Sequence, residues 1–340
     1  MTALATREIG TTGLKVPVLG FGSAPLGDLY EKIPEARALA TVQAAYDTGC
    51  RLFDSAPLYG YGLSEHRVGH VIRQQPRDSY VLSTKVGRWL KPTPPEQIER
   101  GQWTGGLNMQ PIYDYSYDGT FREVEHSLQR LGVERIDILL IHDVDIWTHG
   151  TREDYEERYK QAVDGSFRAL AELRSQGVVK AIGMGVNEIE PCKRLATDAD
   201  PDVFLLAGRY TLLEQEGLDD LMPLARQKKF SFLLGGPFNS GILATGPIEG
   251  AKYNYKPAPP EILERVRRIE AVCQRHSVPL AAAAIQFPLG LSEVASIIPG
   301  AVKPEEVHAN TRLMTHPIPA ALWEELRHEG LLREGTPVPA

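Results

Sequence analysis

The sequence has few cysteines, no long apolar run and no block of like charge, and each absence excludes a class of protein. Its 340 residues include 3 cysteines, which lie far apart and fit neither a disulfide framework nor a metal-binding spacing. No apolar stretch reaches the roughly 18 residues that a membrane span requires. The N-terminus lacks the charged and apolar regions of a signal peptide, so we expect a cytoplasmic protein.

The charge balance argues against a nucleic acid or an anionic membrane as the partner. The formal net charge is -7, and charges of both signs are interspersed along the chain. A nucleic-acid partner would favour a basic face instead. We therefore expect a small-molecule ligand, and either a monomer or a small homo-oligomer.

Short apolar segments alternate with longer amphipathic ones along the whole chain. Near-continuous apolar strands separated by helices predict a parallel sheet that is buried on both faces. Eight such units predict a single (β/α)8 TIM barrel, with residues 1–340 as one domain. A doubly wound open sheet is the alternative, and the absence of a GxGxxG fingerprint after the first strand disfavours it. The expected strands are 18–21, 51–53, 80–84, 136–141, 180–183, 203–206, 231–234 and 295–298.

Two further features of the barrel are expected from the sequence. Residues 8–10 and 14–16 flank a Thr-Thr-Gly turn, which predicts an N-terminal β-hairpin that plugs the bottom of the barrel. Long segments rich in aromatic residues, 87–119 and 143–159, follow the third and fourth strands. Such segments predict long functional loops at the C-terminal face of the barrel.

Polar residues at the C-terminal ends of the strands are the candidates for chemistry, because active sites of such barrels lie on the loops after the strands. Asp54 follows the second strand, Tyr59 lies in the next loop, Lys85 closes the third strand and His142 closes the fourth. Each residue alone has an ordinary structural explanation. Together they converge on one rim of the barrel, which predicts a shared site.

These four side chains suit proton transfer at a carbonyl or hydroxyl oxygen. A phenol has a pKa of about 10, and a nearby ammonium makes its phenolate more accessible. We expect Lys85 to act on Tyr59 in this way, Asp54 to keep Lys85 protonated, and His142 to orient the substrate oxygen. The set includes no activated nucleophile and no metal ligands, so a bound cofactor has to carry the hydride.

The stretch FDSAPLYGYGLSE, residues 53–65, carries two of these candidates together with a second tyrosine. Tyr61 is interpreted as a packing residue. Ser64 precedes a helical pattern and is predicted to be its N-cap.

The motifs around these residues resemble the aldo-keto reductases over nearly the whole chain. They are FDSAPLYGYGLSEHRVG, LSTKVG, IDILLIHD, GVVKAIGMGVNE and IIPGAVKPEEVHANTRL. The resemblance implies a catalytic tetrad of Asp54, Tyr59, Lys85 and His142, with Tyr59 as the proton donor or acceptor.

The resemblance also implies a nicotinamide cofactor, and departures from the family pattern favour NAD. NADP-dependent members carry a lysine and an arginine where this chain has Gly300 and Glu306. A carboxylate repels a 2′-phosphate but accepts hydrogen bonds from free ribose hydroxyls, so NADP is disfavoured although Lys303 lies nearby. The implied cofactor residues are Gly22, Ser23, Asp54, Asn187, Phe238, Asn239, Ser240, Gly241, Pro299, Gly300, Glu306 and Asn310.

Two departures affect the contacts expected at the nicotinamide ring. The usual Ser-Asn pair after the fifth strand reads Gly185-Val186-Asn187, and the glutamine after the sixth strand is replaced by Ala207. Either Asn187 holds the carboxamide from one position later, or the carboxamide is held by other groups.

Within the family, the chain looks most like dehydrogenases that oxidise the anomeric hydroxyl of an aldose with NAD. These are the bacterial L-fucose or D-threo-aldose dehydrogenases and plant L-galactose dehydrogenase. Trp89, His142 and Trp147 are the expected substrate residues, because aromatic faces beside polar groups suit a sugar. A pyridoxal 4-dehydrogenase, a broad aldehyde reductase and a non-catalytic reductase-like binding subunit are the alternatives.

Overall fold

The chain closes into a barrel of eight parallel strands that follow one another in chain order. The computed structural model describes residues 4–339. The first and last strands meet through the backbone, where Gly20 N donates to Ile297 O at 2.9 Å and Gly22 N donates to Pro299 O at 3.1 Å. The predicted (β/α)8 barrel is confirmed. Its strands are β3 (Phe21–Gly22), β4 (Leu52–Asp54), β5 (Val81–Val86), β8 (Ile138–His142), β9 (Ala181–Val186), β10 (Val203–Ala207), β11 (Ser231–Gly235) and β14 (Val294–Ile298).

Apolar side chains cover both faces of most strands, which is why these strands read as continuous apolar runs, whereas β5 carries Ser83, Thr84 and Lys85 at its centre. In β8, Ile138 and Leu140 join the cluster inside the barrel. Leu139 and Ile141 point the other way and belong to the layer between the sheet and the helices. The alternation follows from the two-residue period of a strand.

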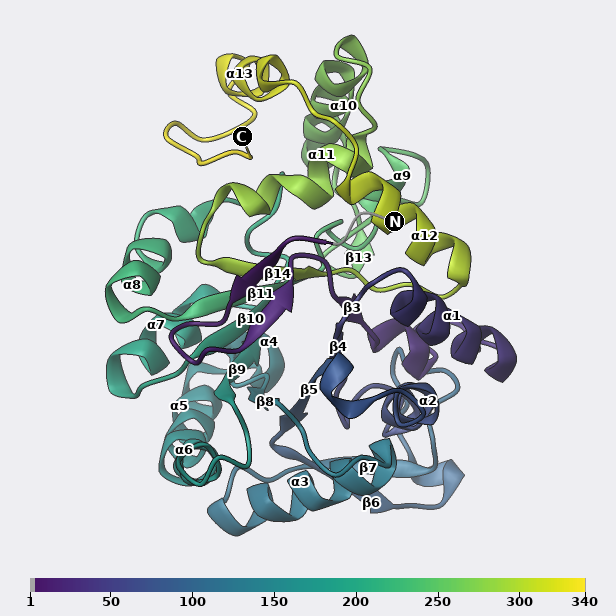
Figure 1. Ribbon diagram of the computed structural model, residues 1–340, viewed down its shortest axis with the longest axis vertical. Coiled ribbons are helices and arrows are strands. Elements are labelled where there is room, and N and C mark those ends of the chain that lie inside the picture. Colours follow the sequence, from purple (N-terminus) through teal and green to yellow (C-terminus); the bar gives the residue numbers. More distant parts are fainter. Residues whose placement is uncertain (1–3, 340) are drawn as a thin grey trace.

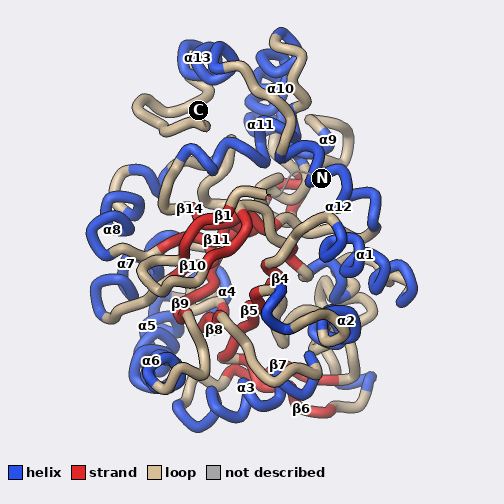
Figure 2. The backbone as a smooth tube through the Cα atoms, in the orientation of Figure 1, coloured by secondary structure: helices blue, strands red, loops and turns tan. Residues whose placement is uncertain are grey.

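Helices surround the barrel, as Figures 1 and 2 show. A π-helical turn at Ala162–Phe167 joins two of them, Arg152–Gln161 and Arg168–Ser175. The helices are α1 (Glu35–Asp47), α2 (Leu63–Ile72), α3 (Tyr117–Leu131), α4 (Ile146–His149), α5 (Arg152–Gln161), α6 (Arg168–Ser175), α7 (Ile189–Asp198), α8 (Leu221–Lys228), α9 (Ile242–Thr245), α10 (Pro260–Arg275), α11 (Leu280–Gln286), α12 (Pro304–Met314) and α13 (Ala320–His328). No helix of residues 4–339 has both the length and the apolar character needed to cross a membrane.

The N-terminal hairpin lies across the end of the barrel at which the strands begin (Figure 1). Its strands are β1 (Thr6–Glu8) and β2 (Lys15–Pro17). Ile9 and Val16 are fully buried and join the cluster inside the barrel. Gly10 N donates to Ser231 Oγ, at the first residue of β11, at 2.8 Å. The predicted plug is therefore present, and the opposite end of the barrel is left for ligands.

Hairpins and short helices order much of the segments that follow the strands at this opposite end. Strands β6 (Arg88–Pro92) and β7 (Met109–Tyr113) pair within the predicted loop 87–119, and α4 and most of α5 lie within 143–159. A second small hairpin, β12 (Lys252–Tyr253) and β13 (Lys256–Pro257), follows α9.

The start of α2 differs from the prediction, because Ser64 is not its N-cap. The helix begins at Leu63 after Gly62, which takes the cap position with φ of +97°. Ser64 is fully buried, and its Oγ donates to Ser23 O at 2.8 Å. The hydroxyl thus ties the helix to the segment after β3 instead of satisfying the helix's own amide groups.

Candidate active site

Two adjoining cavities open at the C-terminal ends of the strands. The first, of about 320 Å³, is the polar cavity, whose lining includes Lys85, His142, Asp143 and Asn187. The second, of about 340 Å³, is the glycine-rich cavity, whose lining includes the main chain of five glycines. The residues that line both are Ala24, Leu29, Tyr59, Leu205, Ala207 and Tyr255.

Asp54 and Lys85 form a buried ion pair beneath the junction of the cavities. Asp54 ends β4, and Lys85 lies in the neighbouring strand β5. Lys85 Nζ donates to Asp54 Oδ2 at 2.7 Å and to Ser55 O at 2.8 Å. Ser83 Oγ donates to the other carboxylate oxygen at 2.8 Å. The side chains of Asp54 and Lys85 are 2% and 1% exposed, so the pair is almost completely removed from water.

The ion pair keeps Lys85 charged. Burial by itself lowers the pKa of the Lys85 ammonium, but the negative charge of Asp54 and its hydrogen bond with Lys85 oppose burial, and that pKa lies above its ordinary value. The expected effect of Asp54 on Lys85 therefore agrees with the geometry.

Tyr59 carries its phenol ring between Lys85 and the two cavities. Lys85 Nζ lies 4.7 Å from the centre of the Tyr59 ring, and the His142 ring lies 5.8 Å from it, nearly perpendicular. The loop that carries Tyr59 needs a glycine on the facing segment, because a Cβ added at Gly27 would lie 2.5 Å from the carbonyl carbon of Tyr59. Four side chains from three strand ends thus meet at one place.

Burial changes the expected acidity of this phenol. It raises the pKa of Tyr59 to about 12, and the positive charge of Lys85 offsets only part of this rise. The expectation from charge alone, that Lys85 makes the phenolate accessible, omitted the larger effect of burial. Tyr59 is therefore a neutral phenol at pH 7 in the protein alone.

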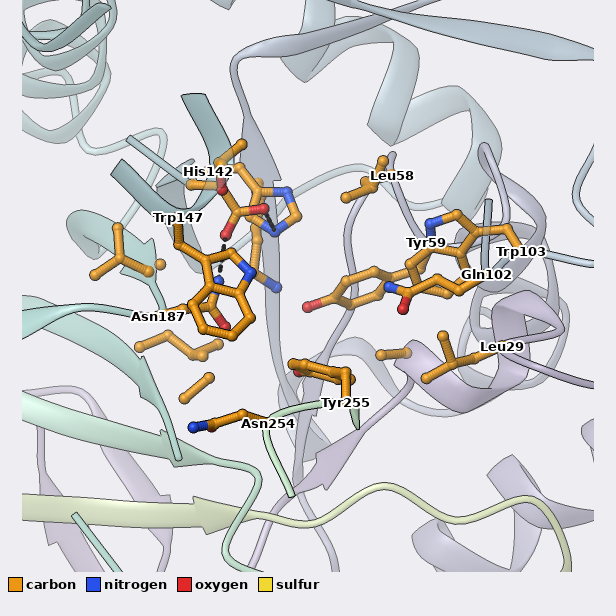
Figure 3. A pocket seen from close by; sticks show the side chains of 18 of the residues that line it. Leu29, Leu58, Tyr59, Gln102, Trp103, His142, Trp147, Asn187, Asn254 and Tyr255 are labelled. Atoms are coloured by element: carbon orange, nitrogen blue, oxygen red, sulfur yellow. Dashed lines mark hydrogen bonds and ion pairs between the residues drawn. The ribbon is translucent and has the colours of Figure 1, made fainter. Parts of the chain in front are cut away.

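His142 is a neutral imidazole at the top of the polar cavity, as drawn in Figure 3. Burial, with the nearby charges of Arg88 and Lys85, holds the pKa of His142 well below its ordinary value. Its Nε2 lies 3.4 Å from Asp143 Oδ2, and its Nδ1 is buried with no hydrogen-bond partner. This arrangement favours the tautomer that carries its proton on Nε2, because Asp143 is the available acceptor.

Asp143 lines the polar cavity and was not among the expected site residues. Arg88 Nη2 lies 2.8 Å from Asp143 Oδ2, and Asn187 Nδ2 donates to Oδ1 at 3.2 Å. Asp143 follows the strand-end residue His142, so period-two alternation predicts that its side chain points away from the cavity. Its φ of +51° breaks that alternation, and no sequence signal indicated this.

Of the other two expected substrate residues, Trp147 lies in the polar cavity and Trp89 does not. Trp147 lines the polar cavity and is 45% exposed. Trp89 lines neither cavity, because it lies on β6 with Arg122 over its ring at 5.1 Å. Trp103, from the same predicted loop, lines the polar cavity instead and packs against Tyr59 with ring centres 5.7 Å apart.

Figure 3 shows how aromatic and amide groups surround the polar cavity. Tyr59 and Trp103 lie on one side, and Trp147 and Asn187 lie on the other. Tyr255 comes from the turn between β12 and β13, a position that the strand-end argument did not consider.

Half of the expected cofactor residues line the glycine-rich cavity, and Asn187 lines the polar cavity. The side chains of Ser23 and Asn239 are occupied within the protein: Ser23 Oγ donates to Asp54 O, and Asn239 Oδ1 accepts from Thr211. Glu306 accepts a hydrogen bond from Val302 N at 2.9 Å. Pro299 and Asn310 line a much smaller hollow beside Leu19. The expected cofactor residues that line the glycine-rich cavity are Gly22, Asp54, Phe238, Ser240, Gly241 and Gly300.

No group of three or more His, Cys, Asp or Glu side chains that could hold a metal ion occurs between residues 4 and 339.

Comparisons with known proteins agree with this geometry. The model of the aldo/keto reductase family matches residues 18–328. A pyridoxal 4-dehydrogenase from Microbacterium luteolum is 42% identical, with 98% of this chain and 99% of that protein covered. A D-threo-aldose 1-dehydrogenase from a Pseudomonas species is 38% identical over 94% of this chain and 96% of its own. An aldo-keto reductase structure from Bacillus halodurans in its holo form covers 98% of both chains with a TM-score of 0.74, and at 24% identity it supports the fold alone.

The low pKa of His142 predicts a specific dependence of stability on pH. Below about pH 6.5 the unfolded chain protonates this imidazole but the folded protein does not, so acid lowers the free energy of unfolding. We expect His142→Gln to reduce the loss of stability between pH 6.5 and 5 by up to about 1 kcal/mol per pH unit. Urea unfolding at several pH values measures this slope.

The control for this prediction is His328→Gln, which removes an exposed imidazole from α13. An unchanged slope in His142→Gln, with the wild-type slope also in the control, would contradict a buried neutral His142.

Proposed function

Because this chain belongs to the aldo/keto reductase family, we propose that it is an NAD-dependent dehydrogenase that oxidises the anomeric C1 hydroxyl of an aldose to the lactone. The observation that carries the proposal is the meeting of Tyr59, Lys85 and His142 at the junction of two cavities. One cavity suits a polar ring, and the other suits an extended cofactor.

The glycine-rich cavity fits the nicotinamide cofactor that enzymes of this family use. Its wall is largely main chain, and a Cβ added at Gly241 would meet no atom within 4 Å. A glycine of this kind leaves open space beside the main chain, in which a ligand can approach it closely. Phe238, Ser240 and Gly300 are the other residues that we assign to this contact. When bound, the cofactor supplies the hydride acceptor.

Tyr59 is the residue that we assign to take the proton of the substrate hydroxyl. Its pKa of about 12 means that the phenolate is scarce at neutral pH, so the positive charge of Lys85 is needed to make it available at all. Asp54 holds Lys85 in place and charged. His142, neutral and protonated on Nε2, orients the reacting oxygen by donating a hydrogen bond to it.

The lining of the polar cavity supports a sugar as the substrate. Trp103, Trp147 and Tyr255 present aromatic faces, while Asp143 and Asn187 present polar atoms. A sugar ring has apolar C–H surface and many hydroxyl groups, so it needs both kinds of contact. The 38% identical relative, a D-threo-aldose 1-dehydrogenase, supports the same substrate class.

Pyridoxal is the second candidate substrate. The 42% identical relative that covers 98% of this chain is a pyridoxal 4-dehydrogenase. An aromatic cavity suits a pyridine ring, and the reaction class is the same, since both substrates present the hydroxyl of a cyclic hemiacetal. The same proton-transfer groups serve either substrate.

NAD is the proposed form of the cofactor, because no cation is committed to a 2′-phosphate at the positions expected for one. Gly300 has no side chain that could bind a phosphate. The carboxylate of Glu306 accepts a hydrogen bond from the main-chain N–H of Val302, two residues after Gly300. The nearby cation Lys303 is already close to a carboxylate, because its Nζ lies 3.8 Å from Glu306 Oε1. A phosphate at this place would therefore meet a carboxylate.

The proposed function predicts which compounds reduce NAD. We expect NADH formation with at least one of L-fucose, D-arabinose, L-galactose and L-glucose, followed by absorbance. Pyridoxal is assayed in parallel, and turnover of pyridoxal alone would replace the aldose proposal by the second candidate. Cofactor binding without turnover of any of these compounds would instead favour a non-catalytic binding subunit.

Replacing Tyr59 tests the proton-transfer assignment. Tyr59→Phe removes one oxygen, and we expect it to lower kcat by at least about 10²-fold, the usual contribution of acid–base catalysis. The dissociation constant for NADH, measured by fluorescence titration, should stay within about threefold, because the ring itself is retained. In the wild type, kcat/KM for oxidation should rise with pH through the neutral range, since the phenolate becomes more abundant.

Tyr61→Phe is the matched control. Tyr61 is buried nearby, and its hydroxyl donates to the carbonyl oxygens of Glu99 and Arg100. This variant should lose about 1 kcal/mol of stability but keep its kcat. Substantial turnover by Tyr59→Phe would exclude Tyr59 as the group that moves the proton.

The cofactor assignment predicts a kcat/KM at least about tenfold higher with NAD than with NADP, as expected for an unfavourable charge contact of somewhat more than 1 kcal/mol. Glu306→Gln should narrow this ratio by strengthening NADP binding, because it removes the repelling charge. Dissociation constants for both cofactors give a readout that is independent of turnover. A preference of the wild type for NADP would show that Lys303 or another cation binds the phosphate.

A further inference from the structure

A carboxylate stands beside His142 inside the polar cavity and has no part in the proton-transfer set. Asp143 Oδ2 lies 3.4 Å from His142 Nε2. Only 13% of the Asp143 side chain is exposed, and the residue lines the polar cavity. A charged group in this position has to be compensated and has to face something polar.

The backbone at Asp143 brings this carboxylate into the cavity. Consecutive residues of an extended strand point to opposite faces, yet His142 and Asp143 line the same cavity. The left-handed φ of +51° at Asp143 produces this reversal, and Asp143 N is held by Gly185 O at 2.8 Å. Such a φ is uncommon for a residue other than glycine, although aspartate tolerates it better than most.

Three neighbours hold the Asp143 carboxylate without saturating it. Arg88 and His142 face Oδ2, and Asn187 donates to Oδ1. The ion pair with Arg88 opposes the rise in pKa that burial causes at Asp143. A carboxylate has about four acceptor positions on its two oxygens, so an acceptor position remains for a hydroxyl donor in the cavity.

We propose that Asp143 accepts a hydrogen bond from the sugar hydroxyl on the carbon next to the reacting C1, and so selects aldoses that carry that hydroxyl. This inference rests on the proposed function, because it assumes that His142 orients the C1 oxygen. It assigns a specificity-determining contact to a residue outside the proton-transfer set.

The spacing of the two side chains fits two neighbouring hydroxyls. Oxygens on adjacent ring carbons lie roughly one hydrogen-bond length apart, about 2.8 Å. His142 Nε2 and Asp143 Oδ2 are separated by 3.4 Å, which is longer than a usual hydrogen bond, so Nε2 can donate its proton to the C1 oxygen while Asp143 Oδ2 accepts from the hydroxyl on the neighbouring carbon. The sugar hydroxyl donates to Asp143, whereas the carbon next to the reacting carbon of pyridoxal is a ring carbon that bears no hydroxyl and so cannot make this contact. The contact therefore favours an aldose.

A cycle of enzyme variant and substrate tests the contact directly. The best aldose of the panel is compared with its 2-deoxy counterpart, for example D-arabinose with 2-deoxy-D-ribose, in the wild type and in Asp143→Asn. In the wild type we expect loss of the hydroxyl to lower kcat/KM about 10- to 100-fold, as for a hydrogen bond to a charged group. In Asp143→Asn we expect a similar loss with the intact sugar and a change below about threefold with the 2-deoxy sugar, since the contact is already absent.

Asp200→Asn is the control, because it removes a carboxylate that is 91% exposed and precedes β10, at the opposite end of the barrel. Equal losses with both sugars in Asp143→Asn would overturn the inference and leave the proposed function intact. No turnover of any aldose by the wild type would instead overturn the proposed function.

If Asp143→Asn does not fold, Asp143→Glu keeps the charge beside Arg88 and moves the carboxylate by one methylene. This variant should discriminate less between the two sugars than the wild type does. Undiminished discrimination would count against the contact.

Discussion

The buried ion pair of Lys85 and Asp54 is the contact on which the mouth of the barrel depends. Both charges are almost completely removed from water, and a single buried charge without its partner costs several kcal/mol. The pair is tolerated because Ser83 and Ser55 O satisfy further hydrogen-bonding positions. Adjacent parallel strands place the two residues at neighbouring ends, so the same strand pairing that builds the barrel also places the charge of Lys85 beside the Tyr59 ring.

A second buried carboxyl group supports Arg88, the residue that contacts Asp143 in the polar cavity. Glu123, on α3, accepts hydrogen bonds from Gly87 N at 2.6 Å and Arg88 N at 2.9 Å. Burial raises the pKa of Glu123 to about 8, although both amides oppose that rise. These bonds fix the start of the β6–β7 hairpin, and Arg88 then reaches Asp143. Glu123, in a helix outside the barrel, thus helps to position Arg88 and, through Arg88, the Asp143 carboxylate in the polar cavity.

The positions of the strands and of the four rim residues follow from the sequence, because both depend on local patterns. An apolar run buried on both faces permits little choice of strand, and a polar residue at its end must face the loops. Asp143 could not be predicted in this way, since its placement depends on one left-handed residue. Trp89 was expected in the polar cavity, but Trp103 lines it instead. The pairing of β6 with β7 decides which of the two rings reaches the cavity, and this pairing could not be predicted either. The pKa of Tyr59 depends on burial, which requires the packed structure.

Six residues line both cavities at the mouth of the barrel, and Tyr59 and Tyr255 are the two aromatic residues among them. Tyr59 lies on the barrel side, where Lys85 Nζ is 4.7 Å from the centre of its ring. Tyr255 lies at the tip of a small hairpin, where its N–H is held by Ser240 Oγ at 3.0 Å and its neighbour Asn254 accepts from Arg209 at 3.1 Å. Because Ser240 lines the glycine-rich cavity and Arg209 also donates to Asn187 O in the polar one, the hairpin tip is hydrogen-bonded to segments that line both cavities.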